Sequence, residues 1–145
     1  MSEVELEQEP ETTVREFFAA LELGALDEAF ELVTPDVVWR NAGLPTLRGT
    51  TAMRRALAGI DRARMRFSAE FHHVVADGDV VLTDRTDHVG LGPVRADFWV
   101  CSTFELRDGR IALWHDRYAW GNVLRGGAAG VLRAVTTPWR RRPGR

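Results

Sequence analysis

Residues 79–89 read DVVLTDRTDHV and follow the turn signal Asp77-Gly78. The branched apolar residues in this stretch predict a β-strand. Side chains alternate between the two faces of a strand, so one face is expected to carry Val81, Thr83, Arg85, Asp87 and Val89. An arginine and an aspartate on an apolar face form an ordinary ion pair at a surface. In a pocket they are a candidate site for acid–base chemistry.

Three further extended runs accompany this strand. Residues 65–72 alternate apolar and polar side chains, and residues 94–106 and 110–120 follow turn signals at 90–93 and 108–109. Four runs joined by short turns predict an antiparallel meander. In the last run one face is expected to carry Ala112, Trp114, Asp116, Tyr118 and Trp120. A purely structural sheet avoids burying a carboxylate among aromatic rings.

The N-terminal half predicts helices instead. Apolar residues recur at helical spacing after the capping pair Thr13 and Glu16, and again over residues 26–33, where Thr34-Pro35 ends the pattern. The linker between these two helices is short, so they are expected to form a tight pair.

A short strand is expected over residues 36–41, with Trp39 and Asn41 on one face. A loop over residues 42–49 then leads to a third helix. Helices first, then a strand, a helix and a long meander predict an α+β domain whose helices pack on one face of a bent sheet. Helices on the concave side of a strongly curved sheet leave a blind apolar cavity.

The chain of 145 residues is expected to form one domain over residues 12–136. Residues 1–11 carry five glutamates and predict a solvated, disordered acidic tail. Residues 122–135 have weak helical spacing diluted by glycine, and residues 137–145 predict a basic tail.

Bulk composition excludes several classes of protein. A net charge of −2 gives no global attraction to nucleic acid or to an anionic membrane. No apolar run reaches about 18 residues and no leader sequence opens the chain, so a cytoplasmic location is expected. Cys101 is the single cysteine, which excludes an internal disulfide and a cysteine-based zinc cluster.

The four histidines are expected to have structural roles or to be exposed. His72 and His73 are adjacent, so they should face opposite sides of a strand and make a poor metal pair. His88 and His115 each follow or precede an aspartate of interest and should therefore point to the opposite face. The sequence predicts no metal site.

If the inner faces of the strands coincide, Arg85 can lie between Asp87 and Asp116. One carboxylate could then stay ionised as a general base while the other stays protonated as a general acid. The arginine would hold both in place and supply fixed positive charge. The alternative is a surface salt bridge with no catalytic role.

The motifs RTD at residues 85–87, WHD at 114–116 and W-x-N at 39–41 together resemble the limonene-1,2-epoxide hydrolase family. The resemblance covers roughly residues 14–120. It implies a cone-shaped fold of the NTF2-like, SnoaL-like superfamily, with a mixed, mostly antiparallel sheet. One position departs from the family pattern, because Trp39 stands where the family has a water-holding tyrosine.

The resemblance also implies a one-step hydrolysis of a lipophilic, terpene-like epoxide to a vicinal diol, with no metal or organic cofactor. Asp116 would take a proton from a water held by Asn41 and Trp39. Asp87 would protonate the epoxide oxygen, and Arg85 would orient both aspartates. The expected partners are the epoxide, water and a second copy of the chain in a homodimer.

The walls of the expected pocket are assigned to Leu21, Val89, Trp99 and Tyr118. Register across residues 90–93 decides whether Trp99 or its neighbour Phe98 faces inward. A symmetric hairpin would place Asp97 opposite Asp87.

Two other functions stay open. A polyketide cyclase or an epoxide-opening cyclase on the same fold would use a hydroxyl of the substrate, rather than water, as nucleophile. A non-catalytic ligand-binding or dimerisation module predicts that Arg85, Asp87 and Asp116 do not converge.

Overall fold

The computed structural model describes residues 8–118, 130–132 and 135 of the chain. Its helices are α1 (Pro10–Glu22), α2 (Leu26–Glu31) and α3 (Thr50–Arg62). Its strands are β1 (Val33–Asn41), β2 (Leu47–Arg48), β3 (Arg66–Asp77), β4 (Val80–Leu91), β5 (Val94–Arg107) and β6 (Arg110–Arg117). The predicted α+β class and the meander of four long strands are confirmed.

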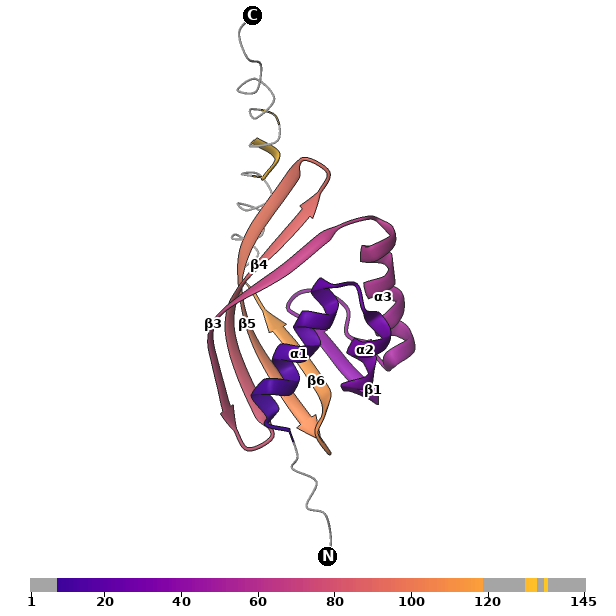
Figure 1. Ribbon diagram of the computed structural model, residues 1–145, viewed down its shortest axis with the longest axis vertical. Coiled ribbons are helices and arrows are strands. Elements are labelled where there is room, and N and C mark those ends of the chain that lie inside the picture. The colour runs from indigo at the N-terminus through magenta and orange to yellow at the C-terminus, as the bar shows by residue number, and fades with distance from the viewer. Residues whose placement is uncertain (1–7, 119–129, 133–134, 136–145) are drawn as a thin grey trace, which may run out of the picture.

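The six strands form one curved sheet in the order β2-β1-β6-β5-β4-β3. Strand β1 runs parallel to β6, and the other neighbours are antiparallel. The three N-terminal helices cover the concave side of this sheet (Figure 1). The mixed, mostly antiparallel sheet with helices on one face is therefore as expected.

Aromatic side chains fill the space between α1 and the sheet. Phe18 lies edge-on to Phe71, Phe104 and Trp114, with ring centroids 5.3–5.8 Å apart. Phe17 contacts Trp114 in the same geometry at 5.4 Å. Each such buried ring stabilises the fold by about 1.5–3 kcal/mol. The helix is thereby fixed over the central strands.

The start of α1 differs from the prediction. The helix begins at Pro10, with Glu9 as N-cap residue, because proline is well suited to the first turn of a helix. Thr13 is buried inside the helix, so the capping pair predicted at Thr13 and Glu16 is wrong. Residues 10–11 of the predicted acidic tail therefore belong to α1, and residues 1–7 of that tail lie outside the described residues.

Strand β1 also begins earlier than predicted. α2 ends at Glu31, and Pro35 lies within β1 instead of stopping a helix. The pairing of β1 with β6 shifts between Val33 and Val38, and such an irregularity accommodates a residue without a backbone N–H. The loop expected over residues 42–49 contains the short strand β2.

Several expectations fall outside the described residues, namely those for Trp120, the basic tail and most of residues 122–135. Of the last segment, residues 130–132 are helical, and Gly130 packs closely on the backbone of Arg95 in β5. Within the described residues, no helix is long and apolar enough to cross a membrane.

Candidate active site

Three charged side chains from two strands converge beneath α1. Arg85 is 0% exposed, Asp87 is 6% exposed and Asp116 is 5% exposed. Arg85 Nε donates to Asp87 Oδ1 at 2.8 Å, and Arg85 Nη2 donates to Asp116 Oδ1 at 3.0 Å. The predicted convergence is therefore present, and the arginine bridges the two carboxylates.

Strand register places Asp116 and its neighbours on adjacent strands in two parallel rows on the inner face of the sheet. The first, termed the polar row, runs across four strands through registered partners: Thr83, Ser102, Asp116 and Asn41. The second, termed the apolar row, lies two residues along each strand and contains Val81, Phe104, Trp114 and Trp39. The polar row thus lies directly beside a row of apolar and aromatic side chains.

Arg85 uses all five of its N–H donors within the protein. Besides its contacts with the two aspartates, Nη1 donates to Ser102 Oγ at 2.5 Å and to Thr83 Oγ1 at 3.3 Å. Its guanidinium carbon lies 4.6 Å from the centroid of the Phe18 ring. A buried arginine with every donor occupied is held rigidly and contributes a fixed positive charge.

The charge balance of the cluster favours one proton shared by two carboxyl groups. One buried arginine neutralises one ionised carboxylate, and a second ionised carboxylate would leave net charge in the interior. Burial raises the pKa of Asp87, Arg85 opposes this effect, and the neighbouring Asp116 adds to it. Asp87 is therefore suited to hold a proton.

Asp116 accepts hydrogen bonds from three side chains on a single oxygen. Its Oδ1 accepts hydrogen bonds from Arg85 Nη2 at 3.0 Å, from Trp114 Nε1 at 2.6 Å and from Ser102 Oγ. Donors directed at a carboxylate oxygen favour the charged form. Among the described residues Oδ2 has no hydrogen-bond partner, so this oxygen is left to the cavity that Asp116 lines.

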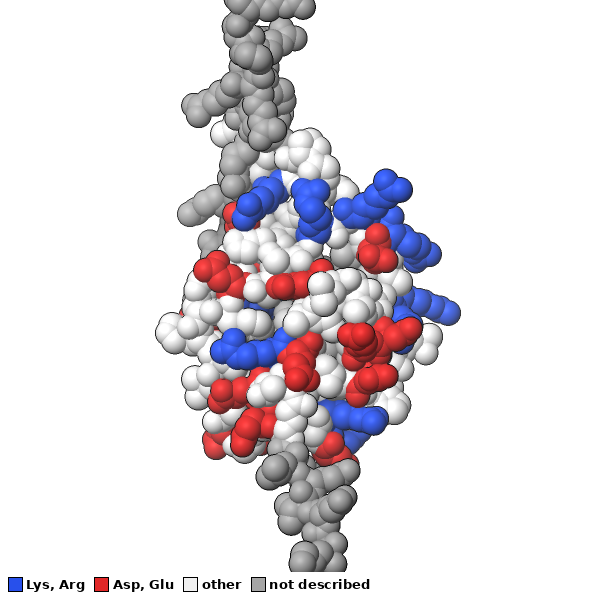
Figure 2. All heavy atoms as spheres, viewed as in Figure 1, with Lys and Arg blue, Asp and Glu red and all other residues white. Residues whose placement is uncertain are grey.

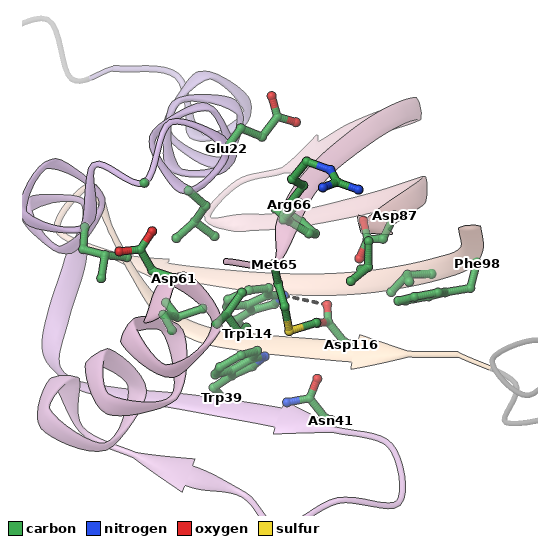
Figure 3. A pocket seen from close by; sticks show the side chains of 18 of the residues that line it. Glu22, Trp39, Asn41, Asp61, Met65, Arg66, Asp87, Phe98, Trp114 and Asp116 are labelled. Atoms are coloured by element: carbon green, nitrogen blue, oxygen red, sulfur yellow. Dashed lines mark hydrogen bonds between the residues drawn. The ribbon is translucent and has the colours of Figure 1, made fainter. Parts of the chain in front are cut away.

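Two stacked indoles lie beside Asp116. Trp39 and Trp114 are nearly parallel, with centroids 4.4 Å apart and an interplanar angle of 10°. Figure 3 shows Trp39 below Trp114, with Asn41 next to Asp116 on the same side. Trp39 Nε1 is buried and has no hydrogen-bond partner among the described residues. It is a buried donor that no described side chain satisfies.

The cavity over these groups has a volume of about 540 Å³. Asp87, Asp116 and Trp114 form its buried end, whereas Glu22 and Asp61 lie at its exposed end. Other lining residues are mostly apolar: Leu21, Leu26, Leu57, Ile60, Met65, Phe67, Val89, Phe98, Val100 and Tyr118. Leu21, Val89 and Tyr118 thus lie where the sequence predicted pocket walls.

The wall assignment of Trp99 is wrong. Trp99 is 52% exposed on the outer face of the sheet and donates through Nε1 to Asp84. The hairpin between β4 and β5 pairs Leu91 with Val94 across a two-residue turn, so Phe98 lies opposite Asp87. Asp97, expected at that position, instead pairs with His88.

The histidines lie on the outer face of the sheet. His88 contacts Asp97 at 2.5 Å, on the face opposite the cavity, as predicted. The prediction that His72 and His73 face opposite sides is wrong. A register shift in β3 between Phe71 and His73 puts both on the outer face, where they contact Thr86 and Asp84. Among the described residues, no cluster of three or more metal-ligating side chains occurs.

Ser102 and the role of Thr83 were missed by the sequence reasoning. A symmetric hairpin at residues 108–109 would pair Ser102 with His115. A β-bulge between Glu105 and Leu106 shifts the register by one residue, so Ser102 lies opposite Asp116. The sequence could have predicted that Ser102 contacts Asp116 only if the position of the bulge were known.

Comparison with known proteins gives consistent results. A family model described as the limonene-1,2-epoxide hydrolase catalytic domain matches residues 8–128. Epoxide hydrolase EphG of Mycobacterium tuberculosis is 36% identical over 125 residues, which cover 84% of this chain and 81% of that protein. The structure of a limonene-epoxide-hydrolase-like enzyme of M. tuberculosis has a TM-score of 0.79 and 34% identity, covering 89% of this chain and 96% of that chain. An NTF2-like protein of Burkholderia pseudomallei, with a TM-score of 0.69 and 18% identity over 83% of this chain and 98% of that chain, shares the fold.

Proposed function

The chain belongs to the limonene-1,2-epoxide hydrolase family and is an epoxide hydrolase, and from that premise we propose a one-step general acid–base mechanism at Asp116 and Asp87. The observation that carries the proposal is the buried arginine that contacts both carboxylates at the closed end of the cavity. A non-catalytic module predicted that these side chains do not converge, so that alternative is contradicted.

Asp116 is the general base. A water in the angle between Asp116, Asn41 and Trp39 would donate one hydrogen to Asp116 Oδ2 and the other to the Asn41 amide oxygen. The indole N–H of Trp39 would donate to the water oxygen, since it can donate but not accept. This arrangement leaves a lone pair of the water oxygen for attack on an epoxide carbon. The family's tyrosine is thus replaced by a residue that fills one of its roles.

Asp87 is the general acid. Arg85 Nε donates to Asp87 Oδ1 at 2.8 Å, and Nη2 donates to Oδ2 at the longer distance of 3.2 Å. Protonated Asp87 gives its proton to the epoxide oxygen as the carbon–oxygen bond opens, while Asp116 takes the proton of the attacking water. The product is a vicinal diol, and a return of the proton from Asp116 to Asp87 through solvent restores the enzyme.

The substrate is a lipophilic epoxide of terpene-like size or larger. The walls above the carboxylates are aliphatic and aromatic, and pockets of 300–1,000 Å³ accommodate small organic ligands. Neither a metal nor an organic cofactor has a role in this mechanism.

The mechanism is tested by incubating the protein with limonene oxide and styrene oxide in ¹⁸O-labelled water. The expected product is a diol with one labelled oxygen, detected by mass spectrometry. Neither epoxide carries a hydroxyl group, so a cyclase that needs a hydroxyl of the substrate as nucleophile would leave both unchanged. Absence of labelled diol would contradict hydrolysis.

Asp116→Asn and Asp87→Asn test the two roles separately. Each is expected to lower kcat/KM at least about a hundredfold, the usual scale for loss of a general acid or base. Asp97→Asn on the outer face is the matched control and should retain the rate. Near-normal turnover in either active-site variant would remove that residue from the mechanism.

We further propose that the protein forms a homodimer through the outer face of the sheet. Trp99 and Leu82 are more than half exposed there, and Val75, the registered partner of Leu82, is 60% exposed. Large exposed apolar residues grouped on one face mark interaction surfaces.

A further inference from the structure

We propose that Ser102 is a positioning residue that keeps Asp116 in its base form and directs proton uptake to Oδ2 of that carboxylate. The proposal rests on the acid–base function described above and adds a residue to it. Ser102 is 2% exposed and lies between Thr83 and Asp116 in the polar row.

The direction of the hydrogen bonds around Ser102 follows from which of its partners can donate and which can accept. A serine hydroxyl has one hydrogen to donate and two lone pairs that accept. Arg85 Nη1 has only hydrogens to offer, so Ser102 Oγ accepts from it at 2.5 Å. The hydroxyl hydrogen is then free to point at Asp116 Oδ1, the second close partner of Ser102 Oγ.

This bond completes the set of donors on one oxygen of Asp116. Arg85, Trp114 and Ser102 all donate to Oδ1. An oxygen that already accepts three donors has no room for a proton of its own. A proton taken from water must therefore go to Oδ2, the oxygen on the cavity side.

Ser102 differs in this respect from Thr83, the other hydroxyl on Arg85. Thr83 Oγ1 accepts from Arg85 Nη1 at 3.3 Å and is one strand further from Asp116. The two residues thus share the arginine, but only Ser102 contacts the base. A residue whose single role was to accept a hydrogen bond from the buried guanidinium would contact Arg85 but not Asp116, as Thr83 does.

Ser102→Ala tests the proposal, with Thr83→Val as the matched control. Loss of a hydrogen bond to the charged form disfavours that form. In Ser102→Ala the acidic limb of log(kcat/KM) against pH is expected to move up by about one pH unit, a tenfold loss of rate on that limb. KM should change little, since the hydroxyl does not contact the substrate. Thr83→Val should leave the limb in place, and Ser102→Thr, which keeps a hydroxyl, should restore it.

A limb that stays in place in Ser102→Ala, or that moves equally in Thr83→Val, would overturn the proposal. A readout independent of turnover separates its failure from failure of the epoxide hydrolase mechanism. The ¹³C signal of the Asp116 carboxyl carbon in labelled protein should titrate at a higher pH in Ser102→Ala than in the wild type. An unchanged midpoint contradicts the role of Ser102 whether or not the enzyme opens an epoxide.

Discussion

At the scale of single residues, the opposite roles that we propose for two aspartates in one cluster rest on their different hydrogen-bond donors. Asp116 Oδ1 accepts from arginine, tryptophan and serine. Among the described residues, Asp87 accepts hydrogen bonds from Arg85 alone, and it lines the cavity. Under the proposed mechanism, the same side-chain chemistry therefore serves as a base at one position and as an acid at the other.

The proposed acid role of Asp87 predicts a pH dependence of the stability of the fold. Burial raises the pKa of Asp87 above its ordinary value of 3.8, so the folded protein binds this proton more tightly than the unfolded chain. The stability due to the proton is fully present below the ordinary value and is lost as pH rises through the raised pKa. Asp87→Asn removes this dependence, so its melting temperature should exceed that of the wild type by an amount that grows with pH.

Thermal melts at several pH values measure this effect, with Asp97→Asn as a control of opposite sign. The hydrogen bond from His88, followed by that from Arg95, lowers the pKa of Asp97, so its stabilisation is lost as pH falls. Asp97→Asn should therefore melt lower than the wild type at neutral pH. If the melting temperature of the wild type instead exceeds that of Asp87→Asn by an amount that increases with pH, Asp87 is ionised in the folded protein.

Trp39 should contribute to turnover through its N–H group and not only through packing. Trp39→Phe keeps a ring against Trp114 but removes the donor, so kcat should fall about tenfold to a hundredfold, while KM changes less. Trp39→Tyr restores a hydroxyl donor and should be more active than Trp39→Phe. Initial rates of diol formation measure both. Full activity in Trp39→Phe would mean that the indole N–H does not hold the water.

At the scale of secondary-structure elements, alternation along single strands was predictable, whereas pairing between strands was not. Period-two alternation correctly placed Arg85 and Asp87 on one face of β4. Trp99 and Ser102 depend instead on a two-residue turn between β4 and β5 and on a bulge in the β5–β6 hairpin. A slip of one residue reverses the face of every side chain, and neither feature has a distinct mark in this sequence.

Helix α3 offers a stabilising change away from the site. Gly59 lies inside the helix, and a Cβ built there meets nothing within 4 Å. Gly59→Ala should stabilise the fold by about 0.5–1 kcal/mol, which raises the melting temperature by roughly 2–5 °C in a domain of this size. Activity should not change.

Gly130→Ala should have the opposite effect on the stability of the fold. A Cβ at Gly130 would lie 2.0 Å from the carbonyl oxygen of Arg95, so backbone must shift. Its melting temperature should fall where that of Gly59→Ala rises. Equal effects of the two substitutions would contradict the packing of the 130–132 segment on β5.

At the scale of the whole molecule, the two faces of the sheet have different uses. The concave face carries the helices, the core and the cavity. Both signs of charge are spread over the side of the molecule seen in Figure 2, so no single-sign field dominates that side. The outer face combines exposed Trp99 and Leu82 with ion pairs such as that between His88 and Asp97.

The proposed dimer is tested by the mass of the protein in solution. Size-exclusion chromatography with light scattering should give twice the chain mass of 16.3 kDa. Trp99→Arg should shift the protein to the monomer, because a charge would be buried at the centre of the interface. Leu44→Arg, which alters an exposed apolar residue outside the sheet, should stay dimeric. A dimeric Trp99→Arg variant would place the interface elsewhere.

The parallel stack of Trp39 on Trp114 should also provide a spectroscopic signal that reports on binding in the cavity. Two indoles 4.4 Å apart and 10° from parallel couple their electronic transitions, which gives a characteristic signal in near-ultraviolet circular dichroism. Both rings line the cavity, so a molecule that enters it changes the environment of the pair. Binding of unreactive analogues, such as diols or ethers, could therefore be titrated on the native protein without a label and without any reaction.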